Sequence, residues 1–294
     1  MIQLHTRNIT LNSLNEEIIP YREPAWLQLM EQTNISKTIL GYIPLHWHEE
    51  LQFTVVQQGT IELHILGEKV VIAEGAGFFI NSGIVHEIHA KTNNAIYICW
   101  NLGIPLFDKH IQKKYILPLI QEGNMPFVIF NSSNKRHKHM IQAIEMSYET
   151  YNKKGNGYEL IMTMQYLSCL NALLPEIGLH SNNHHPIYDQ RVKTILEYIH
   201  NHFREQIKLE SLSKIVHLSN AETIRIFKRH VERTPFKYIL DYRLERSIDL
   251  LIGTRSTITE VALECGFTSV SYFIQKFKEI YHMTPRKYRQ QKTV

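Results

Sequence analysis

Residues 258–278 have the sequence Ile258-Thr-Glu-Val-Ala-Leu-Glu-Cys-Gly-Phe-Thr-Ser-Val-Ser-Tyr-Phe-Ile-Gln-Lys-Phe-Lys278 and carry the clearest structural signal in the chain. Apolar residues at helical spacing lie on both sides of Gly266-Phe267, and Thr268-Ser269 offers hydroxyl groups that can cap the second segment. The pattern predicts a short helix, a tight turn and a second helix, which together make a helix-turn-helix unit.

This stretch is the second copy of a repeat with an offset of 50 residues. The repeated residues are Phe227-Lys228, Thr234-Pro235, Lys237 and Tyr238, then Phe277-Lys278, Thr284-Pro285, Lys287 and Tyr288. Ahead of the first Phe-Lys pair, a helical segment at 209–216 is followed by His217-Leu218 and a capping Ser219, which predicts another helix-turn-helix unit. Residues 236–252 predict one connecting helix of roughly 25 Å at 1.5 Å per residue. Such a helix can hold two recognition helices about one DNA turn, ~34 Å, apart.

Charge is divided unevenly along the chain. Residues 186–294 hold 19 Lys and Arg against 12 Asp and Glu, a net charge of +7, whereas residues 1–185 hold 13 against 16, a net charge of −3. A basic surface for a polyanionic partner is therefore expected in the C-terminal part. The polar segment 179–189 contains Pro186 and has no hydrophobic period, so we assign it, with His180, His184 and His185, to a linker and not to a metal site.

The part before the linker has two kinds of pattern. Residues 38–101 contain short apolar runs separated by glycines, which predicts several strands in a small sandwich or barrel. From Lys135 onward apolar residues recur at helical intervals on either side of Gly155-Asn-Gly157, which predicts an antiparallel helix pair at about 135–153 and 157–176.

Composition limits the class of protein. Of the 294 residues 44% are apolar and 20% are charged, which suits a folded chain of about two domains. The three cysteines lie far apart without a CxxC spacing, so we expect no disulfide framework and no cysteine-rich zinc site. Because the start of the chain lacks a signal-peptide pattern and no run of 18 apolar residues occurs, we expect a cytoplasmic protein without a membrane anchor.

The C-terminal motifs resemble the signature of the AraC/XylS family of transcription regulators over about residues 190–291. The matching segments are Ile258–Phe267, Ser271-Tyr-Phe273, Phe277-Lys278 and Thr284-Pro285 with Tyr288-Arg289. The resemblance implies recognition helices that begin at Ser219 and Ser269 and end at about Val231 and Tyr281. It further implies that bases are contacted by Asn220, Ala221, Glu222 and Arg225 in the first helix and by Val270, Ser271 and Gln275 in the second.

Side-chain chemistry supports part of this assignment. Arg225 can pair bidentately with a guanine edge and Gln275 with an adenine edge, each worth roughly 1–3 kcal/mol of discrimination. Many family members have arginine at the position of Gln275, so a different base preference is expected there. Phosphate contacts are expected from Ser219, Lys228, Ser269, Lys278, Arg286, Lys287 and Arg289. The alternative for Lys228 and Lys278 is a solvated face without a partner.

Four further residues depart from the family pattern. Glu232 and His282 stand where the family usually has glycine after each recognition helix, and each costs on the order of 1–2 kcal/mol if the left-handed backbone persists. His217 replaces a usual glycine and Thr223 a usual leucine. The first module is therefore expected to be the less stable one.

The N-terminal strands contain two motifs that resemble those of cupins, over about residues 38–101. His46, His48 and Gln52 share strand parity, so one face can carry all three, and Gly75-x5-Asn81-x-Gly83-x2-His86 suits a facing strand. Metal-binding cupins have glutamate at the position of Gln52, and a proline is usual at that of Asn81. We favour a polar pocket that binds a small molecule through hydrogen bonds from His46, His48, Gln52, His64 and His86. The alternative is a divalent metal on His46, His48, Gln52 and His86, which the missing carboxylate disfavours.

Taken together, the sequence predicts an α+β protein. The expected parts are a cupin-like effector-sensing β-barrel at 1–133, a helix pair for dimerisation at 134–178, a linker at 179–189 and an all-α double helix-turn-helix domain at 190–294. The expected function is a sequence-specific transcription regulator, an activator, whose barrel senses a sugar or other metabolite. Its expected partners are operator DNA, the effector, a second copy of the chain and RNA polymerase.

Two other functions are alternatives for a chain of this sequence. A cupin metalloenzyme, a dioxygenase or isomerase with an accessory helical domain, would need near-stoichiometric metal. An architectural DNA protein would show little sequence preference and would need no pocket. The sequence has no nucleophile-base pattern and no phosphate-binding glycine loop, so we expect neither an enzyme nor a cofactor.

Overall fold

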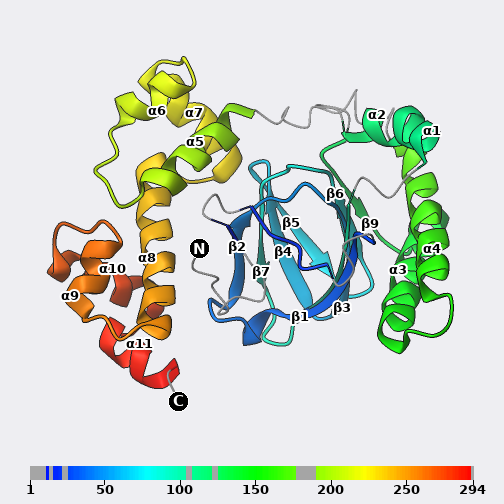
Figure 1. Cartoon of the computed structure of the whole chain (residues 1–294), viewed down its shortest axis with the longest axis horizontal. Helices are drawn as coiled ribbons and strands as arrows, with labels where there is room; N and C mark the ends of the chain where they lie inside the picture. Colours follow the sequence, from blue (N-terminus) through cyan, green and yellow to red (C-terminus); the bar gives the residue numbers. More distant parts are fainter. Residues whose placement is uncertain are drawn as a thin grey trace. The chain divides into compact units, whose positions relative to one another are not determined.

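The computed structural model describes residues 11–12, 16–21, 26–103, 108–120, 125–176 and 190–292. Most of these residues form two compact units, one of residues 16–176 and one of residues 190–292. In Figure 1 the first unit runs from blue to green and the second from yellow-green to red. The linker predicted at 179–189, with its three histidines, lies outside the described residues.

The N-terminal unit is built on two antiparallel sheets. One sheet has the order β1-β8-β3-β6-β9, with β1 at Gln28–Asn34, β3 at Leu51–Gln58, β6 at Gly77–Ile80, β8 at Ile96–Leu102 and β9 at Phe127–Phe130. The other has the order β2-β7-β4-β5, with β2 at Tyr42–His46, β4 at Thr60–Ile65, β5 at Glu68–Ala73 and β7 at His86–Ala90. Among the described strands each sheet ends in its own edge strands, so the predicted β domain is a sandwich rather than a closed barrel.

Side chains along β3 point alternately into two different environments. Leu51, Phe53 and Val55 belong to the large apolar core, whereas Gln52 and Thr54 point to the opposite face and hydrogen-bond to each other. The five-stranded sheet therefore has one apolar face and one face that carries polar side chains.

The apolar face is covered by the two predicted helices, α3 at Lys135–Lys153 and α4 at Tyr158–Leu173 (Figure 1). Asn134 caps α3, and α3 ends at Lys154 in the left-handed conformation. The ring of Tyr166 on α4 lies 6.2 Å from that of Phe53 and 5.8 Å from that of Trp100, measured between centroids. One face of the helix pair thus completes the core of this unit. The short segments η1 (Ile35–Lys37), α1 (Lys109–Ile111), η3 (Gln112–Ile116), α2 (Leu117–Ile120) and η4 (Leu174–Glu176) connect the larger elements.

The C-terminal unit is all helical in its described part. Its helices are α5 (Gln190–His202), α6 (Leu209–Ile215), α7 (Asn220–Val231), α8 (Pro235–Gly253), α9 (Ile258–Glu264), α10 (Val270–Tyr281) and α11 (Pro285–Lys292). The connecting helix expected at 236–252 is α8. No helix in the described ranges of the chain is long and apolar enough to cross a membrane.

The sequence repeat is visible as a repeated ring contact. Phe227 on α7 meets Tyr238 on α8 edge to face at 5.7 Å, and Phe277 on α10 meets Tyr288 on α11 in the same way at 5.5 Å. In each copy this pair fixes the last turns of a helix-turn-helix unit to the following helix, which explains why both residues recur at the same offset.

Candidate functional site

Two helix-turn-helix modules, α6–α7 and α9–α10, form the C-terminal candidate site. The side chain of Ser219 accepts a hydrogen bond from the backbone N–H of Glu222 at 3.2 Å, and that of Ser269 accepts one from Tyr272 at 3.3 Å. The predicted capping residues therefore begin both recognition helices.

The two turns differ at equivalent positions. Gly266 has φ +78°, and a Cβ atom there would lie 2.5 Å from the carbonyl oxygen of Phe203, so the close approach requires glycine. His217 has φ +53° and is exposed, which leaves room for its side chain. Glu232 and His282 also have left-handed backbones, with φ of +58° and +56°. The first module therefore carries one more strained residue than the second.

The base-contacting candidates of α7 are not all free for DNA. Arg225 has a 65% exposed side chain, and its Nε donates to the Glu222 carboxylate at 3.0 Å. Asn220 accepts a hydrogen bond from the hydroxyl group of Ser213 at 2.7 Å, and Ala221 is exposed. To contact guanine, Arg225 must therefore break its hydrogen bond with Glu222 and bind the base edge instead.

In α10, Ser271 and Gln275 are exposed and Val270 is half-buried. The side-chain amide of Gln275 donates to Glu279 at 3.0 Å, and Lys276 pairs with the same carboxylate at 2.7 Å. The structure thus places the two sets of base-contacting candidates in the first turns of α7 and α10. In each set a glutamate contacts the longest side chain, Glu222 for Arg225 and Glu279 for Gln275.

Most of the phosphate-contacting candidates are exposed to solvent. The exposed ones are Ser219, Lys228, Ser269, Lys278, Arg286 and Lys287. Arg289 differs because it is half-buried and its Nε donates to the carbonyl oxygen of Leu251 at 2.8 Å. Its guanidinium group joins α11 to the end of α8.

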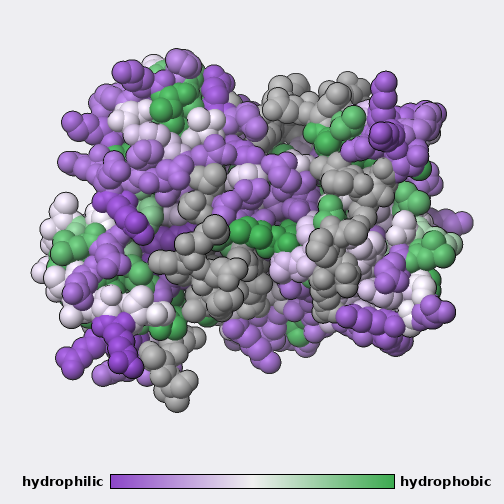
Figure 2. Space-filling model, viewed as in Figure 1, coloured by the Kyte–Doolittle hydropathy of each residue, from purple (hydrophilic) through white to green (hydrophobic). Residues whose placement is uncertain are grey.

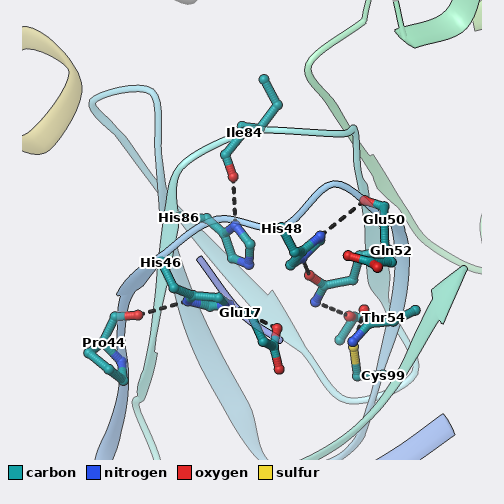
Figure 3. A network of polar contacts seen from close by, with 11 residues as sticks. Glu17, Pro44, His46, His48, Glu50, Gln52, Thr54, Ile84, His86 and Cys99 are labelled. Carbon is teal, nitrogen blue, oxygen red and sulfur yellow. Dashed lines mark hydrogen bonds and ion pairs between the residues drawn. The ribbon is translucent and has the colours of Figure 1, made fainter. Parts of the chain in front are cut away.

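A second candidate site lies between the sheets, where His46, His48 and His86 meet (Figure 3). The three side chains are 3% exposed or less, and their candidate ligand atoms all lie within 4.8 Å of one another. Each Nδ1 lies within hydrogen-bonding distance of a backbone carbonyl oxygen, at 2.8 Å from Pro44, 3.0 Å from Glu50 and 2.9 Å from Ile84 respectively. When Nδ1 of neutral His46 or His86 donates to its carbonyl, Nε2 of that ring carries the lone pair. His48 differs, because its Nε2 faces the amide oxygen of Gln52, which can only accept, so Nε2 carries the proton in that contact.

Gln52 borders this cluster, but not through a strand shared with His46 and His48, because β2 ends at His46 and Gln52 lies on β3 in the other sheet. Its Oε1 lies 2.7 Å from His48 Nε2, and its Nε2 donates to Thr54 at 2.9 Å. Burial lowers the pKa of His86 well below its usual range, and the neighbouring His46 and His48 lower it further, so this ring is neutral. The Nε2 atom of His86 is buried and has no hydrogen-bond partner among the residues that the structure describes.

His64 does not join the cluster. In the pairing of β4 with β7, Ile65 is opposite His86 and His64 is opposite Glu87, so His64 lies on the other face of the sheet. There its Nε2 lies 2.9 Å from Glu62, whose carboxylate also pairs with Lys91 at 2.7 Å. His64, Glu87 and His89 make a second, more exposed cluster.

Glu17 was not predicted as a site residue. Its backbone N–H donates to the carbonyl oxygen of Trp47 at 2.8 Å, and its carboxylate Oε2 lies 3.6 Å from His46 Nε2. Burial, together with the charges of Glu31 and Glu50, raises the pKa of Glu17 to about 8. No sequence motif includes this residue, since it precedes His46, the first histidine of the cluster, by 29 positions.

Comparisons with known proteins agree with both parts of the chain. A helix-turn-helix domain family matches residues 212–291, and a cupin domain family matches residues 41–100. The HTH-type transcriptional regulator YdeC of Bacillus subtilis is 34% identical over 287 residues, which cover 96% of this chain and 98% of that protein. The chain belongs to the AraC-type transcriptional regulators.

Other AraC-type regulators are more distant. The transcriptional activator RhaS of Enterobacter sp. is 23% identical over 250 residues, which cover 84% of this chain and 87% of that protein. A solved structure of an AraC-type transcriptional regulator from Chromobacterium violaceum is 27% identical, covers 35% of this chain and 92% of that one, and has a TM-score of 0.34.

Membership of the AraC-type family determines the broad function. The chain is a DNA-binding transcription regulator with a cupin domain at its N-terminal side. The relatives compared above carry the names of regulators, so the metalloenzyme alternative is not favoured.

Proposed function

We propose that this AraC-type regulator activates transcription as a homodimer, and that its N-terminal sandwich senses a small molecule such as a sugar. The observation that carries the DNA-binding part is the duplicated module, which presents two capped recognition helices joined through α8. The relative RhaS is named a transcriptional activator, which supports activation as the proposed role. Because an activator acts on RNA polymerase, we propose that enzyme as a further partner. Because a transcription regulator must reach chromosomal DNA, we propose that the protein acts in the cytoplasm.

The proposed DNA contacts follow from exposure and chemistry. Arg225 and Gln275 contact base edges together with Asn220, Ala221, Glu222, Val270 and Ser271. Lys228, Lys278, Arg286 and Lys287 contact phosphates, which position the protein without specifying a sequence. The carboxylates of Glu222 and Glu279 hold Arg225 and Gln275 in place in the absence of DNA, so specificity depends on the exchange of these contacts for base edges.

The proposed dimer contact is the face of α4 that points away from the sheet. Leu160, Met164 and Leu167 follow one another at helical spacing and are 67%, 63% and 38% exposed. Met146 on α3 is 52% exposed. Apolar residues appear in green on the helix pair in Figure 2. A second copy of this chain would cover such a stripe with an identical one, as two-fold interfaces do.

Sedimentation at micromolar protein tests the dimer. The parent chain should sediment as a dimer, and Leu160→Lys with Met164→Lys should give a monomer because two charges would enter the apolar contact. Asn152→Lys is the control, because Asn152 is an exposed polar residue of α3. A monomeric parent, or a double variant that remains dimeric, would contradict the proposal.

Effector sensing is tested by the affinity for an operator duplex with and without a panel of pentoses and hexoses. A sensor whose two states differ in DNA affinity must show a ligand-dependent change in that affinity. Unchanged affinity with every sugar, together with unchanged thermal stability of the N-terminal unit, would contradict a sugar-sensing role and leave DNA binding unaffected.

A further inference from the structure

Lysine and arginine are unevenly distributed in the N-terminal part of the chain. Residues 108–139 hold 6 of them against 2 acidic residues, whereas the rest of residues 1–185 holds 7 against 14. The six cationic side chains are exposed and form two basic segments, 109–114 and 135–138. The first segment, in α1 and η3, has Lys109, Lys113 and Lys114, and the second, at the start of α3, has Lys135, Arg136 and Lys138. This part of the chain is therefore acidic except in the two basic segments.

The cations of the basic segments have no carboxylate partner among the described residues. Elsewhere in the same unit, Lys91 pairs with Glu62 at 2.7 Å. Asp108 is next to the first basic segment, but its carboxylate caps α1 and accepts a hydrogen bond from the backbone N–H of His110 at 2.8 Å. The other acidic residue of this stretch, Glu122, lies outside the described residues. Within the described part of the chain, the six positive charges are thus open to a partner from outside.

The start of α3 carries charge of the sign that a helix disfavours there. The N-terminal end of the helix dipole is positive, so anionic groups stabilise it and cationic side chains do not. The first turn of α3 has no acidic residue, and Lys135 and Arg136 occupy its first two positions. Asn-Ser-Ser-Asn at 131–134 and His-Lys-His at 137–139 complete a stretch without any apolar side chain. A polyanion that binds this stretch would relieve the repulsion and meet many groups that hydrogen-bond to phosphate.

The chain leaves the N-terminal unit beside the second basic segment. Glu176, the last residue of η4, has its Oε1 atom 3.7 Å from Nε2 of His137, which lies between Arg136 and Lys138. Thirteen residues, 177–189, connect Glu176 to the first residue of α5 in the DNA-binding unit. At about 3.6 Å per residue this connection spans at most about 50 Å, or about one and a half turns of DNA at ~34 Å per turn. DNA next to the operator therefore lies within reach of the second basic segment.

We propose that the two basic segments bind the phosphate backbone of DNA that flanks the operator. Both lie on the side of the five-stranded sheet that carries the helix pair (Figure 1). Ile116 just after the first segment and Ile141 just after the second belong to one apolar core, so the two segments are parts of one packed body. The proposed DNA contacts given above belong to the C-terminal unit. This inference goes beyond them and rests only on operator binding by that unit.

The shape and position of the partner favour DNA over other anions. Duplex DNA carries one negative charge per about 1.7 Å of its axis, so it can contact two separate segments at once, which a small anion cannot. When the C-terminal unit is bound to an operator, the tether also holds flanking DNA at a high effective concentration. A separate acidic protein does not have this advantage.

The experiment measures the affinity of the full chain for two duplexes that share one operator selected from random DNA. The short duplex ends at the operator, and the long duplex adds about 20 base pairs of arbitrary sequence on each side, which exceeds the reach of the tether. Fluorescence anisotropy is recorded at several salt concentrations with unlabelled competitor DNA. Two triple variants each remove one basic segment. They are Lys109→Gln with Lys113→Gln and Lys114→Gln, and Lys135→Gln with Arg136→Gln and Lys138→Gln.

The matched control removes the same number of positive charges from other exposed positions of the same unit. It combines Lys37→Gln in η1 with Lys153→Gln and Lys154→Gln at the far end of α3. Thermal unfolding checks that each variant folds as the parent does, and if one triple variant fails to fold, the other decides.

The parent should bind the long duplex at least about tenfold more tightly than the short one at low salt. Its slope of log affinity against log salt concentration should be steeper by about two or more on the long duplex, because each phosphate contact contributes about 0.9. Each triple variant should lose a large part of this gain and reduce the slope on the long duplex by about one to three. Both should bind the short duplex as the parent does, and the control should match the parent on both duplexes.

Equal affinities and equal salt slopes of the parent on the two duplexes would overturn the inference and leave operator binding intact. A control that loses as much of the gain as the triple variants would also overturn it, because the effect would then come from net charge and not from these segments. A parent without sequence preference on the short duplex would contradict operator binding itself, and the inference with it.

Discussion

Replacing Gly266 with alanine tests how the second helix-turn-helix module is held together. The turn between α9 and α10 has φ +78° at this residue, and an added Cβ would lie 2.5 Å from the Phe203 carbonyl oxygen and 2.9 Å from Arg204 Cα. The left-handed backbone costs about 1–2 kcal/mol for a residue with a Cβ, and overpacking against backbone about 1–3 kcal/mol more. The total, about 2–5 kcal/mol, is a large part of the roughly 5–15 kcal/mol that stabilises a domain.

Thermal unfolding of the full chain measures this effect. For a domain of this size each kcal/mol lowers the Tm by about 4–8 °C, so Gly266→Ala should lower the Tm of the C-terminal unit by at least about 8 °C. Gly253→Ala is the matched control, because Gly253 ends α8 and an added Cβ there would meet no atom of the described part of the chain within 4 Å. If Gly266→Ala unfolds at the same temperature as Gly253→Ala, the argument from close packing is refuted.

Three further predictions concern the same unit. Arg225→Ala should weaken binding to the preferred operator by roughly 1–3 kcal/mol and relax the preference at one base pair. Lys278→Ala should weaken binding to all sequences alike and reduce the slope of log affinity against log salt concentration by about one. Fluorescence anisotropy titrations at several salt concentrations separate the two effects, and identical behaviour of the two variants would contradict the assignment. His217→Gly should stabilise the first module by about 1 kcal/mol, because it relieves a left-handed backbone, and an unchanged or lower Tm would count against that strain. Hydrogen bonding from the Thr257 backbone lowers the pKa of Glu260 from its ordinary 4.5, so the stabilisation is present above that pH and is lost as the pH falls through the lowered pKa. The Tm difference between the parent and Glu260→Gln should therefore vanish on acidification from pH 7, and a difference that grows would contradict the capping role.

The C-terminal unit could be predicted because its signals are local and duplicated. The capping serines, the apolar spacing and the Phe-Tyr repeat each act over a few turns of helix, and the boundaries of α7, α8 and α10 follow them closely. The contacts of Glu222 with Arg225 and of Glu279 with Gln275 were not predicted, because a side chain on a helix surface has several partners within reach.

Only the part of the N-terminal site that is formed by residues close together in the sequence could be predicted. The short sequence spacing of His46, His48 and Gln52 brings them together, although they do not share the single strand that parity assumed, since β2 ends at His46 and β3 begins at Leu51. Parity also carries no information on which residue of β4 faces His86. The register places Ile65 there and turns His64 to the opposite face. Glu17 was missed because a bridge near Trp47 brings it to the cluster, and bridges between distant segments leave no periodic pattern.

Selection of operators from random duplex DNA, followed by footprinting of the purified chain on the selected sequence at near-physiological salt, tests most directly whether two modules bind one specific site. Two adjacent protected segments of the major groove, about 10 bp apart, are predicted, because the two recognition helices enter successive grooves on one face of the duplex. A single protected segment, or protection that is equal on all sequences and disappears with added salt, would contradict a double helix-turn-helix regulator.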